Sequence, residues 1–297
     1  MAQAKRFGSH PVSARSAPFV VLGAGGFIGT ALVAWLESRD HRVHAVTRAA
    51  VPALLAARQP CGHVIDCIGL NGHFRSRPIN AAEAHVGVVA RCLSELRFES
   101  FLLLSSTRVY RHACATHEDT ALPSLPADPA DLYNLMKLAG EALCLSDRRP
   151  AVRVVRLSNV YGPGMPAETV LGAALRGSPT GSVVFHQGPG STRDYVSIAS
   201  VVRLLPAIAT VGRDRIYNVA AGSNTSHATI ADRLRKDLGW QVRFVAEAPT
   251  VRLLPIDTSR LDAEFGPASG NLTDDLTSLL TLDQESQCSP LTRPAAA

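Results

Sequence analysis

A glycine-rich turn follows the first apolar segment of the chain and constrains its fold more than any other feature. Phe19–Leu22 is a short apolar run that leads into Gly23-Ala24-Gly25-Gly26-Phe27-Ile28-Gly29. Apolar residues then recur at helical spacing, at Ile28, Ala31, Leu32, Trp35 and Leu36. Glycines at 23, 26 and 29 permit a tight turn, close backbone approach to a pyrophosphate, and close packing of helix on strand. This pattern predicts a dinucleotide site whose contact residues are Gly23, Gly26, Phe27, Ile28 and Gly29.

Strands and helices alternate through the first half of the chain. We expect strands at Phe19–Leu22, residues 41–47, residues 64–68, residues 101–104 and Val152–Leu157. Helices are expected after the glycine turn, around residues 83–96 and over residues 131–145. Because the strands are apolar on both faces, they predict a parallel sheet covered on both sides, that is, a doubly wound α/β domain.

The second half of the chain differs in composition, with more Gly, Pro and polar residues after Asn159. We expect the strand Ile216–Val219 to rejoin the sheet, and a helix over residues 229–238 to end at Gly239. The predicted organisation is a dinucleotide-binding domain over residues 18–165 and a smaller, mainly substrate-binding C-terminal lobe over residues 166–282. Residues 1–17 and 283–297 lack hydrophobic periodicity and are expected to be flexible tails.

Composition excludes several classes of protein. The 297 residues are 46% hydrophobic and 19% charged, which is typical of a folded protein with a sizeable core. Their apolar runs fall short of the ~20 residues of a membrane helix, and the N-terminus lacks the apolar core of a secretory signal. We therefore expect a cytoplasmic protein that does not bind membranes.

The net charge and the cysteine content restrict the kinds of ligand that the chain is expected to bind. The net charge of +5 comes without a nucleic-acid-binding motif, so it indicates a small anionic ligand and no nucleic acid. The six cysteines include no C-x-x-C pair. We expect them to be buried free thiols, with neither a metal site nor disulfides.

The end of the second expected strand bears on the choice of cofactor. NAD-binding proteins place an acidic side chain there to accept hydrogen bonds from the ribose hydroxyls. This chain has Thr47 and Arg48 instead. A carboxylate would repel a 2′-phosphate, whereas a hydroxyl and a guanidinium bind one. Thr47 and Arg48 therefore favour NADP(H), with NAD as the alternative.

A group of hydroxyls and a Tyr/Lys pair predict proton-transfer chemistry. Ser105, Ser106 and Thr107 follow an expected strand, at the edge where ligands bind in open α/β sheets. Tyr133 and Lys137 lie four residues apart on a helix, so they share a face. A phenol with a pKa of about 10 is a poor base at neutral pH, and a nearby ammonium favours the phenolate. We expect Tyr133 to move the proton of a substrate oxygen during hydride transfer, which requires its hydroxyl to reach the dinucleotide crevice.

In these motifs, residues 18–265 resemble the extended short-chain dehydrogenase/reductase superfamily, which has a Rossmann fold. The resemblance is specifically to the NAD-dependent epimerase/dehydratase family of nucleotide-sugar enzymes, and residues 156–164, 190–196 and 217–220 also carry it. It implies Ser106, Tyr133 and Lys137 as the catalytic group. It further implies that Ser105, Tyr133 and Lys137 contact the cofactor and that Thr107, Asn159 and Arg193 bind the substrate, the last two through its diphosphate. A homodimer is implied as well.

Some positions depart from the family pattern. Dehydratases of the family usually carry Asp-Glu after the strand-end hydroxyl, and Thr107-Arg108 in this chain disfavours dehydration. His85 stands where members often have an asparagine, and it either contacts the cofactor or packs in the core. Within residues 69–78, Arg75 and Arg77 either bind a substrate phosphate or carboxylate or form a solvated basic loop.

Four functions remain open at this point, one of them a relative that acts on steroid, flavonoid or other ketones, for which Arg193 would have no diphosphate to hold. The leading interpretation is an NADP(H)-dependent oxidoreductase that reduces a nucleotide-activated keto-sugar, of the 4-ketoreductase type. The first alternative is a nucleotide-sugar 4-epimerase with tightly bound NAD. The second is a catalytically silent NADP-binding protein. The sugar and the nucleotide base are left open by the sequence.

Overall fold

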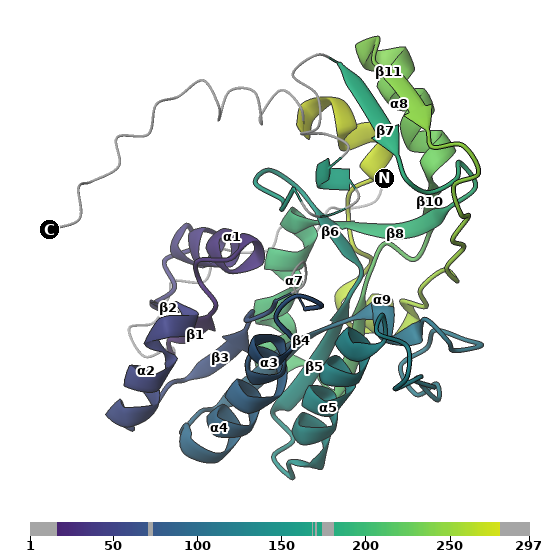
Figure 1. The fold of residues 1–297 in the computed structure, drawn as a ribbon. Helices are drawn as coiled ribbons and strands as arrows, with labels where there is room; N and C mark the ends of the chain where they lie inside the picture. The colour runs from purple at the N-terminus through teal and green to yellow at the C-terminus, as the bar shows by residue number, and fades with distance from the viewer. Residues whose placement is uncertain (1–16, 71–73, 168, 170, 174–180, 280–297) are drawn as a thin grey trace, which may run out of the picture.

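A computed structural model describes residues 17–70, 74–167, 169, 171–173 and 181–279. Six parallel strands form the central sheet in the order β2-β1-β3-β4-β5-β9 (Figure 1). Their bounds are β1 Phe19–Leu22, β2 Val43–Val46, β3 His63–Asp66, β4 Ser100–Ser106, β5 Val152–Leu157 and β9 Ile216–Val219. The strand order reverses at β1, so a ligand crevice lies at the carboxyl ends of β1 and β3. The predicted doubly wound fold is confirmed.

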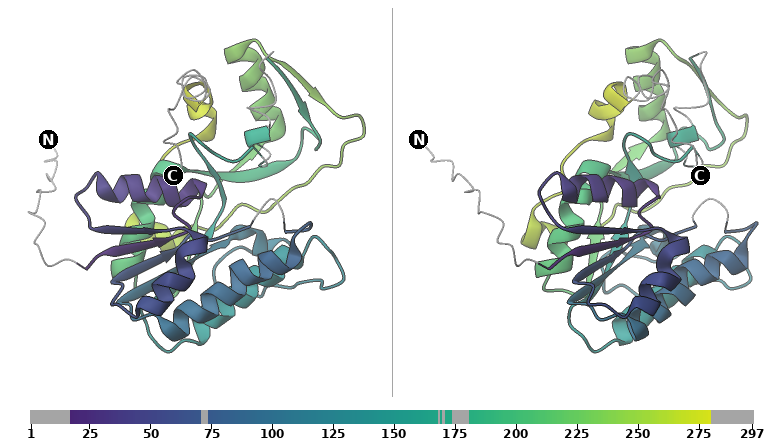
Figure 2. Two further views of the ribbon diagram at one scale, coloured as in Figure 1. Left: turned by 60° about the vertical axis from the view of Figure 1, so that its left-hand side comes forward. Right: turned by 90° about the vertical axis from the view of Figure 1, so that its left-hand side faces the viewer.

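Helices cover both faces of this sheet, as the two views in Figure 2 show. Residues that alternate along the strands enter two separate cores, for example Val21 on one face and Val20 on the other. The first core is completed by α1 (Phe27–Glu37), α7 (Ile198–Val211) and α9 (Ser259–Phe265). The second core is completed by α2 (Val51–Ala57), α4 (Val88–Glu95) and α5 (Leu132–Ser146). No helix among the described residues is long and apolar enough to cross a bilayer.

The helix expected around residues 83–96 begins earlier and is less regular than predicted. It consists of α3 (Pro78–Ala82), the π-helical turn η2 (Glu83–Gly87) and α4, which follow one another directly. The strand expected at residues 41–47 is shorter, and the strand expected at residues 101–104 is longer. Helix α7 was not predicted, because Pro206 interrupts its apolar pattern, yet much of this helix is buried.

A smaller C-terminal part has two sheets of its own, in the orders β10-β8-β6 and β11-β7. Their strands are β6 Asn159–Tyr161, β7 Ser182–Phe185, β8 Thr192–Ser197, β10 Asn224–Ser226 and β11 Gln241–Phe244. Helix α8 (His227–Leu238) packs Ile230 and Leu234 into a third core and ends, as predicted, at Gly239 with φ = 67°. The predicted tails, residues 1–17 and 283–297, lie outside the described residues apart from Ala17.

The cysteines only partly match the prediction. Cys61, Cys92 and Cys144 are buried free thiols, and Cys67 is half-buried. Cys114, however, is exposed, because it lies in the irregular segment after β4 rather than in an apolar element. Cys288 lies outside the described residues.

Candidate active site

The glycine turn has the geometry that a pyrophosphate site requires. Gly23 has φ = 77°, and a Cβ at this position would lie 2.9 Å from the carbonyl carbon of Cys67. A Cβ on Gly29 would collide with the carbonyl oxygen of Gly23, so α1 packs on the turn only because both are glycines. Helix α1 has Gly26 as its N-cap, with no side-chain cap and no acidic residue in its first turn. Its N-terminal N–H groups and dipole therefore favour an anion.

Thr47 lies next to this turn, and Arg48 follows it at the end of β2. The Thr47 Cγ2 atom is 4.0 Å from the place that a Cβ on Gly25 would take. Arg48 lines a cavity of about 190 Å³ together with Glu83 and Arg91. Sequence reasoning missed Arg91, because 42 intervening residues separate it from Arg48 and only the packing of α4 on α2 brings the two together.

The three residues of the predicted catalytic group meet at the carboxyl end of β4. Tyr133 is 6% exposed, and its hydroxyl is hydrogen-bonded to Ser106. The Lys137 ammonium donates to the Leu104 carbonyl oxygen at 2.7 Å and lies 5.8 Å from the centre of the Tyr133 ring. The structure therefore brings together Ser106, Tyr133 and Lys137.

Burial dominates the electrostatics of the phenol and of Lys137. Burial raises the pKa of Tyr133 to about 12, against the Ser106 hydrogen bond and the charge of Arg108, which both lower it. Burial lowers the pKa of Lys137 to about 8, although the carboxylates of Asp66 and Glu141 oppose this effect. Lys137 is not among the groups that lower the pKa of Tyr133 here, and acidification of the phenol by Lys137 stays a prediction.

Two aromatic rings pack on the ring of Tyr133. Phe74 lies 5.5 Å away between ring centres, so the described part of the 69–78 loop reaches the site. His85, from the π-helical turn, presents an edge-on ring at 5.5 Å. The His85 Nε2 atom accepts a hydrogen bond from the Leu70 amide at 3.3 Å. Burial and the charge of Lys137 lower the pKa of His85 to about 3, so this imidazole is neutral.

The predicted substrate residues form two groups. Asn159 in β6 donates from Nδ2 to the Asp194 carbonyl oxygen at 2.8 Å, which places it beside Arg193 in β8. The Arg193 Nη2 atom donates to Gln187 Oε1 at 2.9 Å, while its Nε atom is buried and has no hydrogen-bond partner among the described residues. Thr107 directly follows Ser106 and begins the short helix η3 (Thr107–Tyr110).

A buried polar network that sequence reasoning missed lies behind the site. Glu141 and Arg156 form an ion pair in which each side chain is 3% exposed. The Ser105 hydroxyl donates to Glu141, so its side chain belongs to this network, and the predicted contact of Ser105 with the cofactor stays a prediction. The helical spacing of Tyr133, Lys137 and Glu141, each four residues apart, was the signal that could have revealed this network.

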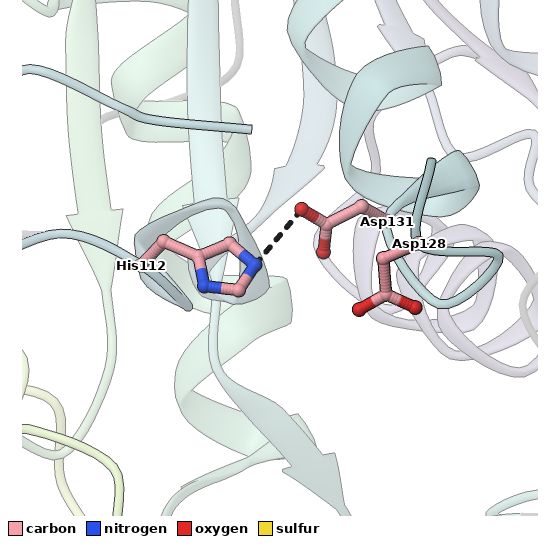
Figure 3. Close-up of side chains that lie close together, drawn as sticks. All are labelled: His112, Asp128 and Asp131. Atoms are coloured by element: carbon pink, nitrogen blue, oxygen red, sulfur yellow. Dashed lines mark ion pairs between the residues drawn. The ribbon is translucent and has the colours of Figure 1, made fainter. Parts of the chain in front are cut away.

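A second polar group holds the start of α5 (Figure 3). His112, Asp128 and Asp131 lie close enough together to suggest a metal site. Arg111 Nη1, however, lies 2.9 Å from Asp131 and 3.1 Å from Asp128, and His112 Nε2 lies 2.9 Å from Asp131. Burial alone would raise the pKa of Asp131, but the Leu125 amide, His112 and Arg111 together lower it. The two carboxylates therefore pair with the Arg111 guanidinium. Because Asp131 lies two residues before Tyr133, these contacts hold the start of α5 in place.

The glycine turn and the Ser106–Tyr133–Lys137 group on a doubly wound sheet define an extended short-chain dehydrogenase/reductase. More particularly, the chain belongs to the NAD dependent epimerase/dehydratase family, whose model matches residues 19–220. It is therefore an enzyme that modifies nucleotide sugars, and an NAD(P) dinucleotide is the cofactor typical of the family.

Known relatives span most of the chain. A dTDP-4-dehydro-6-deoxy-D-allose reductase of Streptomyces bikiniensis is 24% identical in an alignment 268 residues long, which covers 76% of this chain and 82% of the reductase. The structure of MoeE5 in complex with UDP-glucose and NAD has a TM-score of 0.76 and 25% identity, covering 91% of this chain and 100% of MoeE5. RMD from Pseudomonas aeruginosa, complexed with NADPH, shares the fold with a TM-score of 0.72 and 21% identity, covering 90% and 99%.

Proposed function

We propose that this enzyme is an NADP(H)-dependent reductase of a nucleotide-activated keto-sugar, of the 4-ketoreductase type. The observation that carries the proposal is the position of the Tyr133 hydroxyl, which is bonded to Ser106 at the carboxyl edge of β4, with the Lys137 ammonium 5.8 Å from the centre of the Tyr133 ring. A phenol that keeps its proton can donate it to the oxygen of a ketone during reduction. A 4-epimerase would use the same group of residues, and the reductase is favoured over it by Thr47 and Arg48 after β2, which suit NADP(H).

Each residue of the site has a distinct task in this reaction. NADPH, when bound, supplies the hydride. Ser106 orients the ketone oxygen by a hydrogen bond, and Tyr133 donates the proton to that oxygen. Lys137 holds its positive charge beneath the phenol, between the Leu104 carbonyl and the neighbouring carboxylates. Arg193, with its buried Nε unpartnered among the described residues, is suited to grip the diphosphate of the substrate in a bidentate manner.

The residues after β4 support reduction over dehydration. Thr107 and Arg108 occupy the positions at which family dehydratases usually have an acid and a base, and neither can remove a proton from carbon at neutral pH. The similarity to a dTDP-keto-sugar reductase over three quarters of the chain points the same way.

The choice of NADP(H) rests on the end of β2. Thr47 and Arg48 follow this strand, and Arg91 lines the same cavity as Arg48. Two guanidiniums at one cavity favour a 2′-phosphate, since arginine binds phosphate oxygens through paired N–H groups. The one carboxylate that lines this cavity, Glu83, lies on η2 rather than at the end of β2, where it would accept from the ribose hydroxyls.

The test is to supply purified enzyme with NADPH and with UDP-, dTDP- and GDP-linked 4-keto-sugars and to follow the absorbance of the reduced nicotinamide. We expect stoichiometric loss of NADPH with at least one substrate. Tyr133→Phe should lower turnover by at least about 100-fold and leave NADPH affinity unchanged. Tyr217→Phe is the matched control, because that hydroxyl bonds Glu264 and the Asp214 amide outside the site.

Two results would reject the proposal. Conversion of a nucleotide sugar without any lasting absorbance change identifies a 4-epimerase. Turnover by Tyr133→Phe equal to that of the unmodified enzyme removes the assigned proton donor.

A further inference from the structure

Two arginines flank the rings at the proposed proton donor. The Arg108 guanidinium carbon lies 5.7 Å from the centre of the Tyr133 ring and 5.8 Å from that of Phe74. Arg75 stacks over Phe74 at 4.7 Å. Arg75 comes from the loop after β3 and Arg108 from η3 after β4, so two separate segments deliver positive charge to one place. Any group bound beside the Tyr133 hydroxyl will be close to Arg108.

These two charges are not neutralised within the described part of the chain. Neither Arg75 nor Arg108 has a carboxylate within ion-pair distance there. Arg108 donates from Nη2 to the Ala130 carbonyl at 3.0 Å, but its buried Nε finds no partner among the described residues. Burial and the charges of Arg111, Arg75 and Arg193 all lower the pKa of Arg108. A half-buried guanidinium next to other cations is unfavourable unless an anion joins it.

The next arginine in the chain shows the contrast. Arg111 is more exposed than Arg108, yet Asp128 and Asp131 lie within 3.1 Å of it. Arg156 likewise has Glu141 at 2.7 Å. Arg111 and Arg156 thus have carboxylate partners, whereas Arg108 has none within the described residues at the point where substrate must approach Tyr133.

The diphosphate of a nucleotide sugar does not account for this arrangement. Under the proposed function the diphosphate is held by Arg193, from β8 in the C-terminal part. Arg108 instead flanks the phenol that meets the reacting oxygen. Because Arg108 flanks the Tyr133 ring at 5.7 Å, the anionic group best placed to pair with it is one on the sugar ring, near the carbon that receives hydride.

We propose that the substrate of this enzyme is an acidic nucleotide sugar, whose ring carries a carboxylate next to the reacting carbon, and that Arg108, assisted by Arg75, binds this carboxylate. The inference rests on the proposed function. A planar carboxylate fits the fork of N–H groups of a guanidinium, and Nε with one terminal nitrogen forms the paired donor. A sugar with a neutral hydroxymethyl or methyl group at this position leaves Nε unpaired.

The test compares two ligands that differ only at this group, UDP-glucuronic acid and UDP-glucose. Calorimetric titration of the enzyme saturated with its oxidised dinucleotide, at fixed low salt, should give at least about tenfold tighter binding of the acidic sugar. Arg108→Gln should remove this preference while changing the affinity for UDP-glucose by no more than about twofold. Arg75→Gln should reduce the preference in part. Because the Arg75 side chain is exposed, this variant is expected to fold normally, so it tests the inference even if Arg108→Gln folds poorly.

Arg97→Gln is the matched control for lost charge. Arg97 is exposed and precedes β4 at the edge of the sheet opposite the site, so the preference should persist in this variant. Equal affinity of the unmodified enzyme for the two sugars, or a preference that survives Arg108→Gln, overturns the inference and leaves the proposed function standing. If UDP alone fails to bind, or binds equally well to Arg193→Ala, the proposed function fails and the inference fails with it.

Discussion

The Arg156 guanidinium and the Glu141 carboxylate meet inside the protein, with 2.7 Å between Nη2 and Oε2. Two further hydrogen bonds run from Arg156 Nε to the same carboxylate, at 3.1 and 3.2 Å. The Ser105 hydroxyl donates to Glu141, and Arg156 donates to the Tyr110 hydroxyl at 2.8 Å. This pair joins α5, which carries Tyr133, to β5 of the central sheet, so it fixes the helix on which the proposed chemistry depends.

Removing one partner should be costly, because a charge is then left unpaired in a dry environment. We expect Glu141→Gln to lower the free energy of unfolding by about 3–5 kcal/mol in urea denaturation. The control is Asp232→Asn, since Asp232 pairs with Arg235 on the surface, with side chains 75% and 45% exposed. That variant should lose no more than about 1 kcal/mol. Similar losses in both variants would contradict a stabilising role for the buried pair.

The glycine turn allows a steric prediction. Gly29→Ala should lower the melting temperature, since its Cβ collides with the Gly23 carbonyl oxygen and forces α1 away from the turn. Overpacking of this kind typically costs 1–3 kcal/mol, that is, about 2–4 °C or more in a chain of this size. Gly25→Ala lies in the same turn, but its Cβ meets only Thr47 at 4.0 Å, so thermal stability should hardly change. A larger loss in Gly25→Ala than in Gly29→Ala would contradict this reading.

Local patterns were sufficient to predict the central sheet. Short apolar runs such as Phe19–Leu22 and Ile216–Val219 have the composition of strands buried on both faces, and the glycine turn sets the position of the first crossover. The spacing of Tyr133 and Lys137 likewise determines that they share a helix face. Helix α7 escaped prediction because Pro206 is unfavourable in a helix interior, and only tertiary packing against the sheet compensates for it.

Long-range electrostatics could not be predicted from the sequence. The pKa of Tyr133 depends on how Phe74 and His85, from two other segments, bury its ring. The engagement of Ser105 by Glu141 depends on the packing of α5 against β4. No spacing rule relates residues 36 positions apart. The predicted homodimer and cytoplasmic location stay predictions.

The cofactor preference can be tested at Arg48. Arg48→Ala should weaken NADPH binding on the order of 10- to 100-fold, the effect of losing a hydrogen-bonded charge on a phosphate. NADH affinity should stay nearly constant, because NADH lacks the 2′-phosphate. Arg91→Ala should act in the same direction, since Arg91 lines the same cavity. Arg39→Ala, whose guanidinium stacks on Trp35 instead, is the control in fluorescence titrations. A preference for NADH in the unmodified enzyme would refute the assignment.

His85 gives the folded protein a distinctive response to acid. Burial and the Lys137 charge lower its pKa from 6.5 to about 3, so between these values the unfolded chain binds a proton that the folded protein does not. Stability contributed by neutral His85 is therefore present above pH 6.5 and is lost as the pH falls toward 3. Asp66 acts in the opposite sense, because burial raises its pKa from 3.8 to about 6 and the folded protein retains the proton in that window.

The two effects separate in a variant that removes only one of them. His85→Gln keeps a hydrogen-bond acceptor for the Leu70 amide but cannot titrate. We expect the unfolding free energy of the unmodified protein to fall, relative to that of His85→Gln, by a few kcal/mol at most between about pH 7 and about pH 4. His44→Gln, at an exposed position on β2, should follow the unmodified protein throughout. Urea denaturation at several pH values measures the difference, and parallel curves for the unmodified protein and His85→Gln would show that the imidazole is not held neutral by burial.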